Sequence, residues 1–169
     1  HGDIAFLDVL QKMGCDVTEE NNSIVVGAQH AAPLHDRPTH GGAPLRGIDI
    51  YMRDIPDTAQ TLAAIAPFAN SPTTIRGIAS ARVKETDRVA AMCNELRRVG
   101  VTVEEYDDGL KIYPCDKIRP ATIQTYNDHR MAMAFALIGL RAAGITIENP
   151  SCVSKTFPNY FEVLETLRS

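Results

Sequence analysis

The segment 82–88, with the sequence RVKETDR, places three basic and two acidic side chains directly before an apolar helical stripe. Counting back four residues from Val89 reaches Glu85, so this carboxylate is expected to continue the stripe at the start of a helix that begins at Arg82. Basic residues at a helix N-terminus oppose the helix dipole, whereas an anion bound there is favoured. The segment therefore predicts either a solvated helix start or a site for a phosphate or carboxylate group.

Other charged residues stand at the entrances of expected helices. Arg130 lies in the first turn of an otherwise apolar helix, and Lys155 precedes another helix. Asp57 and Asp128 each open an apolar helix, where an aspartate is explained as an N-cap and needs no further function. If cations gather around them, however, Asp57 and Glu85 are suited to general acid–base catalysis on an anionic substrate.

Internal repeats relate these positions to one another. The segment 10–26 recurs 86 residues later, and an offset of 71 residues relates Asp57 to Asp128 and Lys84 to Lys155. The repeated unit is strand, helix, strand, helix, strand, strand, with expected helices over 58–69 and 129–142. One copy runs from about 47 to 113, a second from about 122 to 167, and a third is represented only by its tail, residues 3–26.

The apolar pattern predicts the fold class. Strand segments 101–104, 110–112 and 145–148 alternate between apolar and polar residues, so one sheet face is expected to meet water. The helical segment 131–138 is apolar on all sides, as a fully enclosed helix would be. We therefore expect an α/β fold of repeated βαβαββ units with buried helices and outward-facing sheets. Packing of the units around a pseudo-axis would bring four cations to one rim: Lys84, Arg88, Arg130 and Lys155.

Composition limits the protein class. The 169 residues, 44% hydrophobic and 22% charged, fit one globular domain and exclude a disordered chain or a coiled coil. The net charge of −4 indicates no basic face for nucleic acid. No apolar run of 18 residues spans a membrane. The four cysteines show no C-x-x-C spacing and are expected to be reduced thiols, which favours the cytoplasm.

The stretch 27–46 is rich in Pro, Gly and His and is predicted to be a surface loop. Its histidines at positions 30, 35 and 40 are spaced by five residues, which fits no helix face or strand. A solvated loop is therefore favoured over a metal site.

Four motifs together carry a resemblance to a known family. These are Ile55-Pro-Asp57, the 82–88 segment, the 126–133 segment YNDHRMAM and the 155–161 segment KTFPNYF. In this order they closely resemble the 5-enolpyruvylshikimate-3-phosphate synthases, the 3-phosphoshikimate 1-carboxyvinyltransferases of the shikimate pathway. The resemblance covers essentially the whole chain but corresponds to the C-terminal portion of a two-domain enzyme. It implies that the N-terminal domain is missing from residues 1–169 and that the active site lies between the two domains.

The resemblance also implies roles for individual residues. Asp57 would accept the proton of the shikimate 5-hydroxyl, and Glu85 would transfer a proton at the methylene of phosphoenolpyruvate. Lys84 would contact shikimate-3-phosphate. Arg88, Arg130 and Lys155 would hold the carboxylate and phosphate of phosphoenolpyruvate. Many members carry Asn-Trp just before the Arg-Val-Lys-Glu motif, where this chain has Ser80-Ala81, and the shorter Ser80 side chain would still hydrogen-bond a substrate oxygen. The resemblance implies no metal or organic cofactor.

Two other functions remain open at this stage. The UDP-N-acetylglucosamine enolpyruvyl transferases share the fold and the chemistry, although the motifs at Tyr126 and Lys155 argue against them. A non-catalytic anion-binding module of the same repeats belongs to another class, and the acid pair among the cations argues against it. The isolated chain is expected to fold as one domain and to lack activity, because half of the groups around the transition state would be missing.

Overall fold

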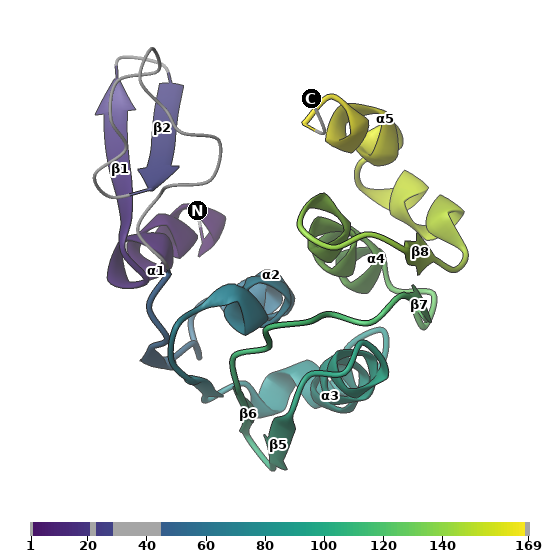
Figure 1. The fold of residues 1–169 in the computed structure, drawn as a ribbon, viewed down its shortest axis with the longest axis horizontal. Helices are drawn as coiled ribbons and strands as arrows, with labels where there is room; N and C mark the ends of the chain where they lie inside the picture. The colour runs from purple at the N-terminus through teal and green to yellow at the C-terminus, as the bar shows by residue number, and fades with distance from the viewer. Residues whose placement is uncertain (1, 21–22, 29–44, 168–169) are drawn as a thin grey trace.

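The computed structural model describes residues 2–20, 23–28 and 45–167 (Figure 1). The middle of the chain forms the complete repeat: β3 (Asp49–Tyr51), α2 (Ala59–Ile65), β4 (Thr73–Arg76), α3 (Arg88–Arg98), β5 (Val103–Tyr106) and β6 (Gly109–Ile112). The following repeat consists of β7 (Ala121–Ile123), α4 (His129–Ala136), β8 (Ile145–Ile147) and α5 (Tyr160–Glu165). The tail of the third repeat consists of α1 (Phe6–Lys12), β1 (Cys15–Glu20) and β2 (Ser23–Ala28).

The sheets follow the predicted unit. The complete repeat forms a four-stranded sheet in the order β3-β4-β6-β5, with β3 parallel to β4 and the β5–β6 hairpin antiparallel. In the next repeat β7 pairs with β8 in parallel, in the same relation as β3 and β4. The tail contributes the antiparallel hairpin β1–β2. The expected βαβαββ organisation is confirmed.

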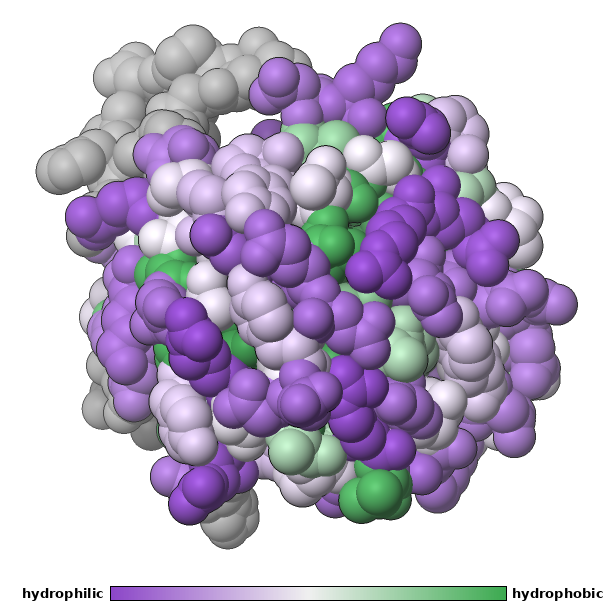
Figure 2. Space-filling model, turned by 90° about the horizontal axis from the view of Figure 1, so that it is seen from below, coloured by the Kyte–Doolittle hydropathy of each residue, from purple (hydrophilic) through white to green (hydrophobic). Residues whose placement is uncertain are grey.

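Helices α2, α3 and α4 lie in the interior with the sheets outside them, whereas α5 lies at the edge of the molecule and buries no residue (Figure 1). Helices α2, α3 and α4 contact one another. Helix α4 buries Met131, Ala132, Ala134, Phe135 and Ala136, which fits its apolar sequence. Figure 2 shows that the surface seen from below is mostly hydrophilic, with only small hydrophobic spots. Apolar side chains thus gather between the helices and the inner sheet faces, and the prediction of buried helices is confirmed.

Matching helix ends support the repeat at atomic detail. The amide of Gly14 donates to Gln11 O at 2.9 Å, and the amide of Gly100 donates to Arg97 O at 3.0 Å. Both glycines have a positive φ, of 99° and 90°, which suits a left-handed residue just after a helix. Each then leads into an antiparallel hairpin, β1–β2 or β5–β6.

The helices are shorter than the sequence suggested. The helix predicted over 58–69 is α-helical only to Ile65 and continues as a 3₁₀ turn, Ala66–Phe68, because Pro67 has no amide to donate. The helix predicted over 129–142 likewise becomes 3₁₀ at Leu137–Leu140. The helix expected from Arg82 begins only at Arg88, since the Asp87 carboxylate accepts from the Ala90 amide at 3.0 Å and caps it there.

Several expectations concern less regular parts of the chain. Of the predicted loop 27–46, residues 29–44 lie outside the described residues, and so do the three histidines. All four cysteines are free thiols, as expected. Across the described ranges, no helix has the length and apolar character needed to cross a membrane.

Candidate active site

The charged residues singled out in the sequence follow the C-terminal ends of parallel strands. Asp57 comes after β3 and Asp128 after β7, while Lys84 comes after β4 and Lys155 after β8. Because β3–β4 and β7–β8 are equivalent parallel pairs, each repeat presents its chemistry-bearing loops at the same end of its strands. Ligands of open α/β sheets commonly bind at this end.

Arg88 is the centre of this group. Its side chain is only 2% exposed, and it donates to three carboxylates. Its Nε lies 2.7 Å from Asp128 Oδ2, its Nη1 2.8 Å from Asp57 Oδ1 and its Nη2 2.8 Å from Glu85 Oε2. A single buried guanidinium therefore holds both proposed catalytic acids and joins α3 to the loops before α2 and α4.

The sequence placed Arg88 at one rim with Lys84, Arg130 and Lys155, whereas the structure buries its side chain. Its guanidinium is engaged by three carboxylates and holds them in place. The N-terminal helix site expected at 82–88 also differs, because Arg82 is bonded to Asp87 at 2.8 Å and to Glu105 at 3.0 Å. Arg82 thereby ties the start of α3 to β5 and contributes no free charge to an anion site.

The two repeat-related aspartates behave differently. Asp128 is fully buried and is the N-cap of α4, accepting from the Arg130 amide at 2.8 Å. The N-cap interpretation is thus confirmed for Asp128. Asp57 lies inside the short 3₁₀ turn Pro56–Thr58 and makes no capping hydrogen bond. Its side chain is 37% exposed and keeps one face open.

Two further cations complete the cluster. Arg130 Nη1 donates to the backbone carbonyl of Asp57 at 3.0 Å, and its Nη2 lies 3.6 Å from Asp57 Oδ2. Lys155 Nζ lies 3.4 Å from Glu85 Oε1 and is 68% exposed. Two acids and three cations from both repeats are thereby brought together: Asp57, Glu85, Arg88, Arg130 and Lys155.

Lys84 and Ser80 are not brought into contact with that cluster. Both are exposed, and neither side chain forms a hydrogen bond or ion pair within the described ranges. Lys84 follows the 3₁₀ turn Ala79–Val83 and comes before α3, so it belongs to neither helix. Their side chains remain available to a ligand.

Local electrostatics distinguish Glu85 from His129. The pKa of Glu85 is lowered most by a hydrogen bond from its own backbone. Burial opposes this effect, and the nearby Arg88 and Lys155 lower the pKa further. Glu85 is therefore a carboxylate at neutral pH. Burial lowers the pKa of His129 despite the neighbouring Asp128, so its imidazole is uncharged at neutral pH.

Sequence reasoning missed Gln60. This side chain is buried in α2, and in the amide orientation that satisfies its neighbours it donates to Asp57 O at 3.2 Å and accepts from Arg88 Nε at 3.0 Å. The available signal was a glutamine in a helix otherwise rich in alanine and leucine. The ion pair of Asp128 with Arg88 was missed too, because a helix N-cap explains an aspartate at this position without a further partner.

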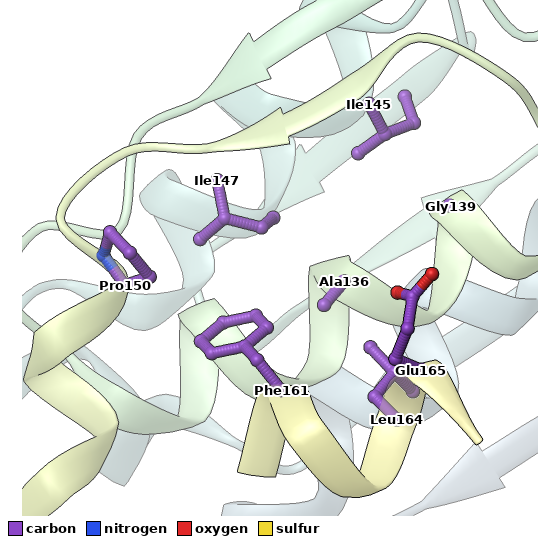
Figure 3. A pocket seen from close by; sticks show the side chains of 8 residues that line it. All are labelled: Ala136, Gly139, Ile145, Ile147, Pro150, Phe161, Leu164 and Glu165. Carbon is purple, nitrogen blue, oxygen red and sulfur yellow. The ribbon is translucent and has the colours of Figure 1, made fainter. Parts of the chain in front are cut away.

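A cavity of about 370 Å³ lies elsewhere, between α4, β8 and α5 (Figure 3). Ile145 and Ile147 of β8 face Phe161 and Leu164 of α5 across it, and the Glu165 carboxylate borders it. It shares no lining residue with the acid–cation cluster. The chemistry is therefore assigned to the strand ends and not to this cavity.

Comparisons with known proteins identify the family of the chain. The sequence profile of the family described as EPSP synthase (3-phosphoshikimate 1-carboxyvinyltransferase) matches residues 1–164. The chain is 50% identical over 166 residues to the chloroplastic 3-phosphoshikimate 1-carboxyvinyltransferase of Brassica napus, covering 98% of the chain and 31% of that protein. It is 52% identical over 160 residues to the enzyme of that name from Nostoc punctiforme, covering 95% and 34%.

A solved EPSP synthase from Acinetobacter baumannii superposes with a TM-score of 0.79 at 28% identity, over 95% of this chain and 38% of that one. The chain thus spans about a third of the length of the curated relatives it matches. Profile, identity and fold agree with the four motifs read from the sequence, and the chain belongs to the EPSP synthase (3-phosphoshikimate 1-carboxyvinyltransferase) family.

Proposed function

We propose that this chain supplies one side of the active site of a 3-phosphoshikimate 1-carboxyvinyltransferase. The complete enzyme transfers the enolpyruvyl group of phosphoenolpyruvate to the 5-hydroxyl of shikimate-3-phosphate and releases phosphate. The observation that carries the proposal is the joining of Asp57 and Glu85 by Arg88, with Arg130 and Lys155 beside them. This arrangement combines acid–base groups with cations for two anionic substrates.

Asp57 is the proposed base for the addition step. As the 5-oxygen of shikimate-3-phosphate attacks C2 of phosphoenolpyruvate, its proton passes to the Asp57 carboxylate, while C3 takes up a proton and becomes a methyl group. Arg88 and Arg130 hold this carboxylate in position before the reaction. The product of this step is a tetrahedral intermediate with phosphate still attached to C2.

Glu85 is the proposed group for the proton on C3. As a carboxylate it is ready to remove a proton from the methyl group while phosphate leaves C2, which gives the enolpyruvyl ether. To deliver a proton in the addition step it must first take one up. A phosphate dianion bound next to Glu85 and competing for Lys155 raises the pKa of Glu85 in the direction needed.

The substrate-binding roles are assigned to side chains that solvent can reach. Arg130 and Lys155 are proposed to contact phosphoenolpyruvate, and Lys84 and Ser80 to contact shikimate-3-phosphate from the exposed turn after β4. The resemblance implied that Arg88 holds phosphoenolpyruvate directly, but its guanidinium is occupied by three carboxylates, so we propose that it acts by aligning Asp57 and Glu85. No metal or cofactor enters this scheme.

The chain is further proposed to be a single domain, the C-terminal portion of a two-domain enzyme whose N-terminal domain is its partner. A reducing compartment is supported by the four free thiols. We propose the cytoplasm, although the Brassica napus relative is named chloroplastic.

The test is an activity assay of the 169-residue chain alone and together with the remaining two thirds of a relative's length, supplied in trans or by fusion. We expect phosphate release from phosphoenolpyruvate and shikimate-3-phosphate only in the combined protein, and no transfer to UDP-N-acetylglucosamine. Turnover by the chain alone would contradict the shared active site. Phosphoenolpyruvate binding without turnover in the combined protein would favour the anion-binding module.

A further inference from the structure

Helix α3 holds the segment Gln124–Asp128 at two points seven residues apart on the helix. Arg88, in its first turn, binds the Asp128 carboxylate. Glu95, two turns later and about 10.5 Å further along the axis, accepts from the Gln124 amide at 3.0 Å and from the Tyr126 hydroxyl at 2.8 Å. Both Arg88 and Glu95 are buried. The start and the end of the segment are thus attached to one rigid helix.

The segment between these points has an unfavourable backbone. Tyr126 and Asn127 are consecutive non-glycine residues with φ of 55° and 54°, in the left-handed region. Such residues persist only where the surrounding structure holds them. The amide of Asp128 donates to Thr125 O at 2.9 Å and closes the turn. The Tyr126 hydroxyl donates to Glu95 Oε1 at 2.8 Å, and the Asn94 side chain also interacts with it.

The hydrogen bond between Glu95 and Tyr126 is well supported on both sides. Glu95 also accepts from Arg98 Nε at 2.8 Å, so both of its buried oxygens have donors. Burial, and then the bond to Glu95, raise the pKa of Tyr126, so its hydroxyl stays protonated and remains a donor. This contact is therefore a stable anchor for the turn.

The turn positions residues of the proposed site. Directly after it, Asp128 binds Arg88 and caps α4, and Arg130 reaches Asp57. A rotation of the turn would displace the Arg130 guanidinium and the acid pair together. We infer that Glu95 is a positioning residue, which acts through the Tyr126 hydroxyl to hold the left-handed turn that places Arg130 for the anionic substrate. This inference rests on the proposed function.

Tyr126→Phe in the combined protein is the sharpest test, because it removes one hydroxyl and keeps the ring. Tyr106→Phe is the matched control: its hydroxyl also donates to a glutamate, Glu104, at 2.6 Å, on the outward-facing sheet. We expect the KM for phosphoenolpyruvate to rise about tenfold in Tyr126→Phe, with the KM for shikimate-3-phosphate within about twofold of the parent. Tyr106→Phe should leave all three kinetic constants unchanged.

Hydrogen exchange of the amides at 126–130 gives a readout that needs no turnover. It should accelerate in Tyr126→Phe and in Glu95→Gln, and not in Tyr106→Phe. If the parent protein shows no turnover, the proposed function fails, and the positioning role is then judged by inorganic phosphate titration and by this exchange. An unchanged exchange rate at 126–130 would overturn the inference. So would an equal fold-change in both KM values and in kcat. Tyr126→Phe keeps the test valid should Glu95→Gln fail to fold.

Discussion

Arg88 Nε lies 2.7 Å from Asp128 Oδ2, and both side chains are almost completely shielded from water. This pair joins α3 of one repeat to the start of α4 in the next. Because Asp128 is fully buried, this guanidinium takes the place of water as the partner of its carboxylate. The pair is therefore important for the fold as well as for the site.

We expect Arg88→Ala to lower the free energy of unfolding by about 3–5 kcal/mol, because it leaves a buried carboxylate unpaired. Arg76→Ala is the control, since Arg76 pairs with Asp49 on the exposed sheet face, where water screens the pair, and should change stability far less. Urea unfolding of the 169-residue variants measures both. Equal effects for the two variants would contradict the buried role of Arg88.

Asp57→Ala and Glu85→Gln in the combined protein should each lower kcat by about 10²-fold or more, the range of general acid–base residues. Binding of shikimate-3-phosphate should change much less for Glu85→Gln, which keeps the shape of the side chain. Asp54→Asn, an exposed aspartate three residues before Asp57, is the matched control and should be neutral. A normal kcat in Glu85→Gln would contradict the catalytic role of Glu85 and leave it only as an ion-pair partner of Arg88.

Arg130→Ala should weaken phosphoenolpyruvate binding by about 1.5–3 kcal/mol, the range for hydrogen bonds to charged groups. Arg141, in the exposed turn after α4, provides the control Arg141→Ala, for which we expect no change. Direct titration with phosphoenolpyruvate measures both. Unchanged affinity in Arg130→Ala would remove Arg130 from the substrate site.

The titration of Glu85 should respond to its neighbours. Lys155→Met removes a nearby positive charge and should raise the pKa of Glu85, and added inorganic phosphate should raise it in the parent chain. Lys117→Met, at an exposed position, is the control. Carbon-13 NMR of the glutamate carboxyl carbons follows both effects.

The same lowered pKa has a consequence for stability. A carboxyl group whose pKa is lower in the folded state stabilises that state above its unfolded pKa, and this contribution is lost as the pH falls through the folded pKa. Glu85→Gln should therefore reduce the acid sensitivity of unfolding. An unchanged pH profile of stability in Glu85→Gln would show that Glu85 gains nothing from its neighbours on folding.

Cys93 should resist alkylation in the folded protein. Its side chain is buried, and burial raises its pKa to about 12, so the reactive thiolate is scarce at pH 8. Cys152, which is partly exposed, serves as the internal control. Mass spectrometry after iodoacetamide treatment should find Cys152 modified in buffer and Cys93 modified only in urea. Equal modification of both in buffer would contradict the buried environment of Cys93.

The fold was largely predictable because repeats and apolar periodicity are properties of many residues at once. The offsets of 71 and 86 residues gave the order of strands and helices, and the apolar segment 131–138 identified an enclosed helix. Helix ends were harder, because they depend on single hydrogen bonds such as that between Asp87 and Ala90.

The site was predictable as a set of residues and less so as an arrangement. Motifs named the acids and cations, but charge at a helix start does not reveal which cation is buried. The packing of α2, α3 and α4 determines that Arg88 is enclosed by Asp57, Glu85 and Asp128. The same packing leaves Lys84 exposed. Glu95 and Gln60 could not be predicted as part of the site for the same reason.

One guanidinium shared by Asp57 and Asp128 limits how far the two repeats are independent of each other. The aspartates occupy corresponding positions 71 residues apart, yet one is a buried cap and the other is partly open. Since both contact Arg88, a change at either one alters the environment of the other. The effects of substitutions at these two positions should therefore not be additive, although the positions belong to different repeats.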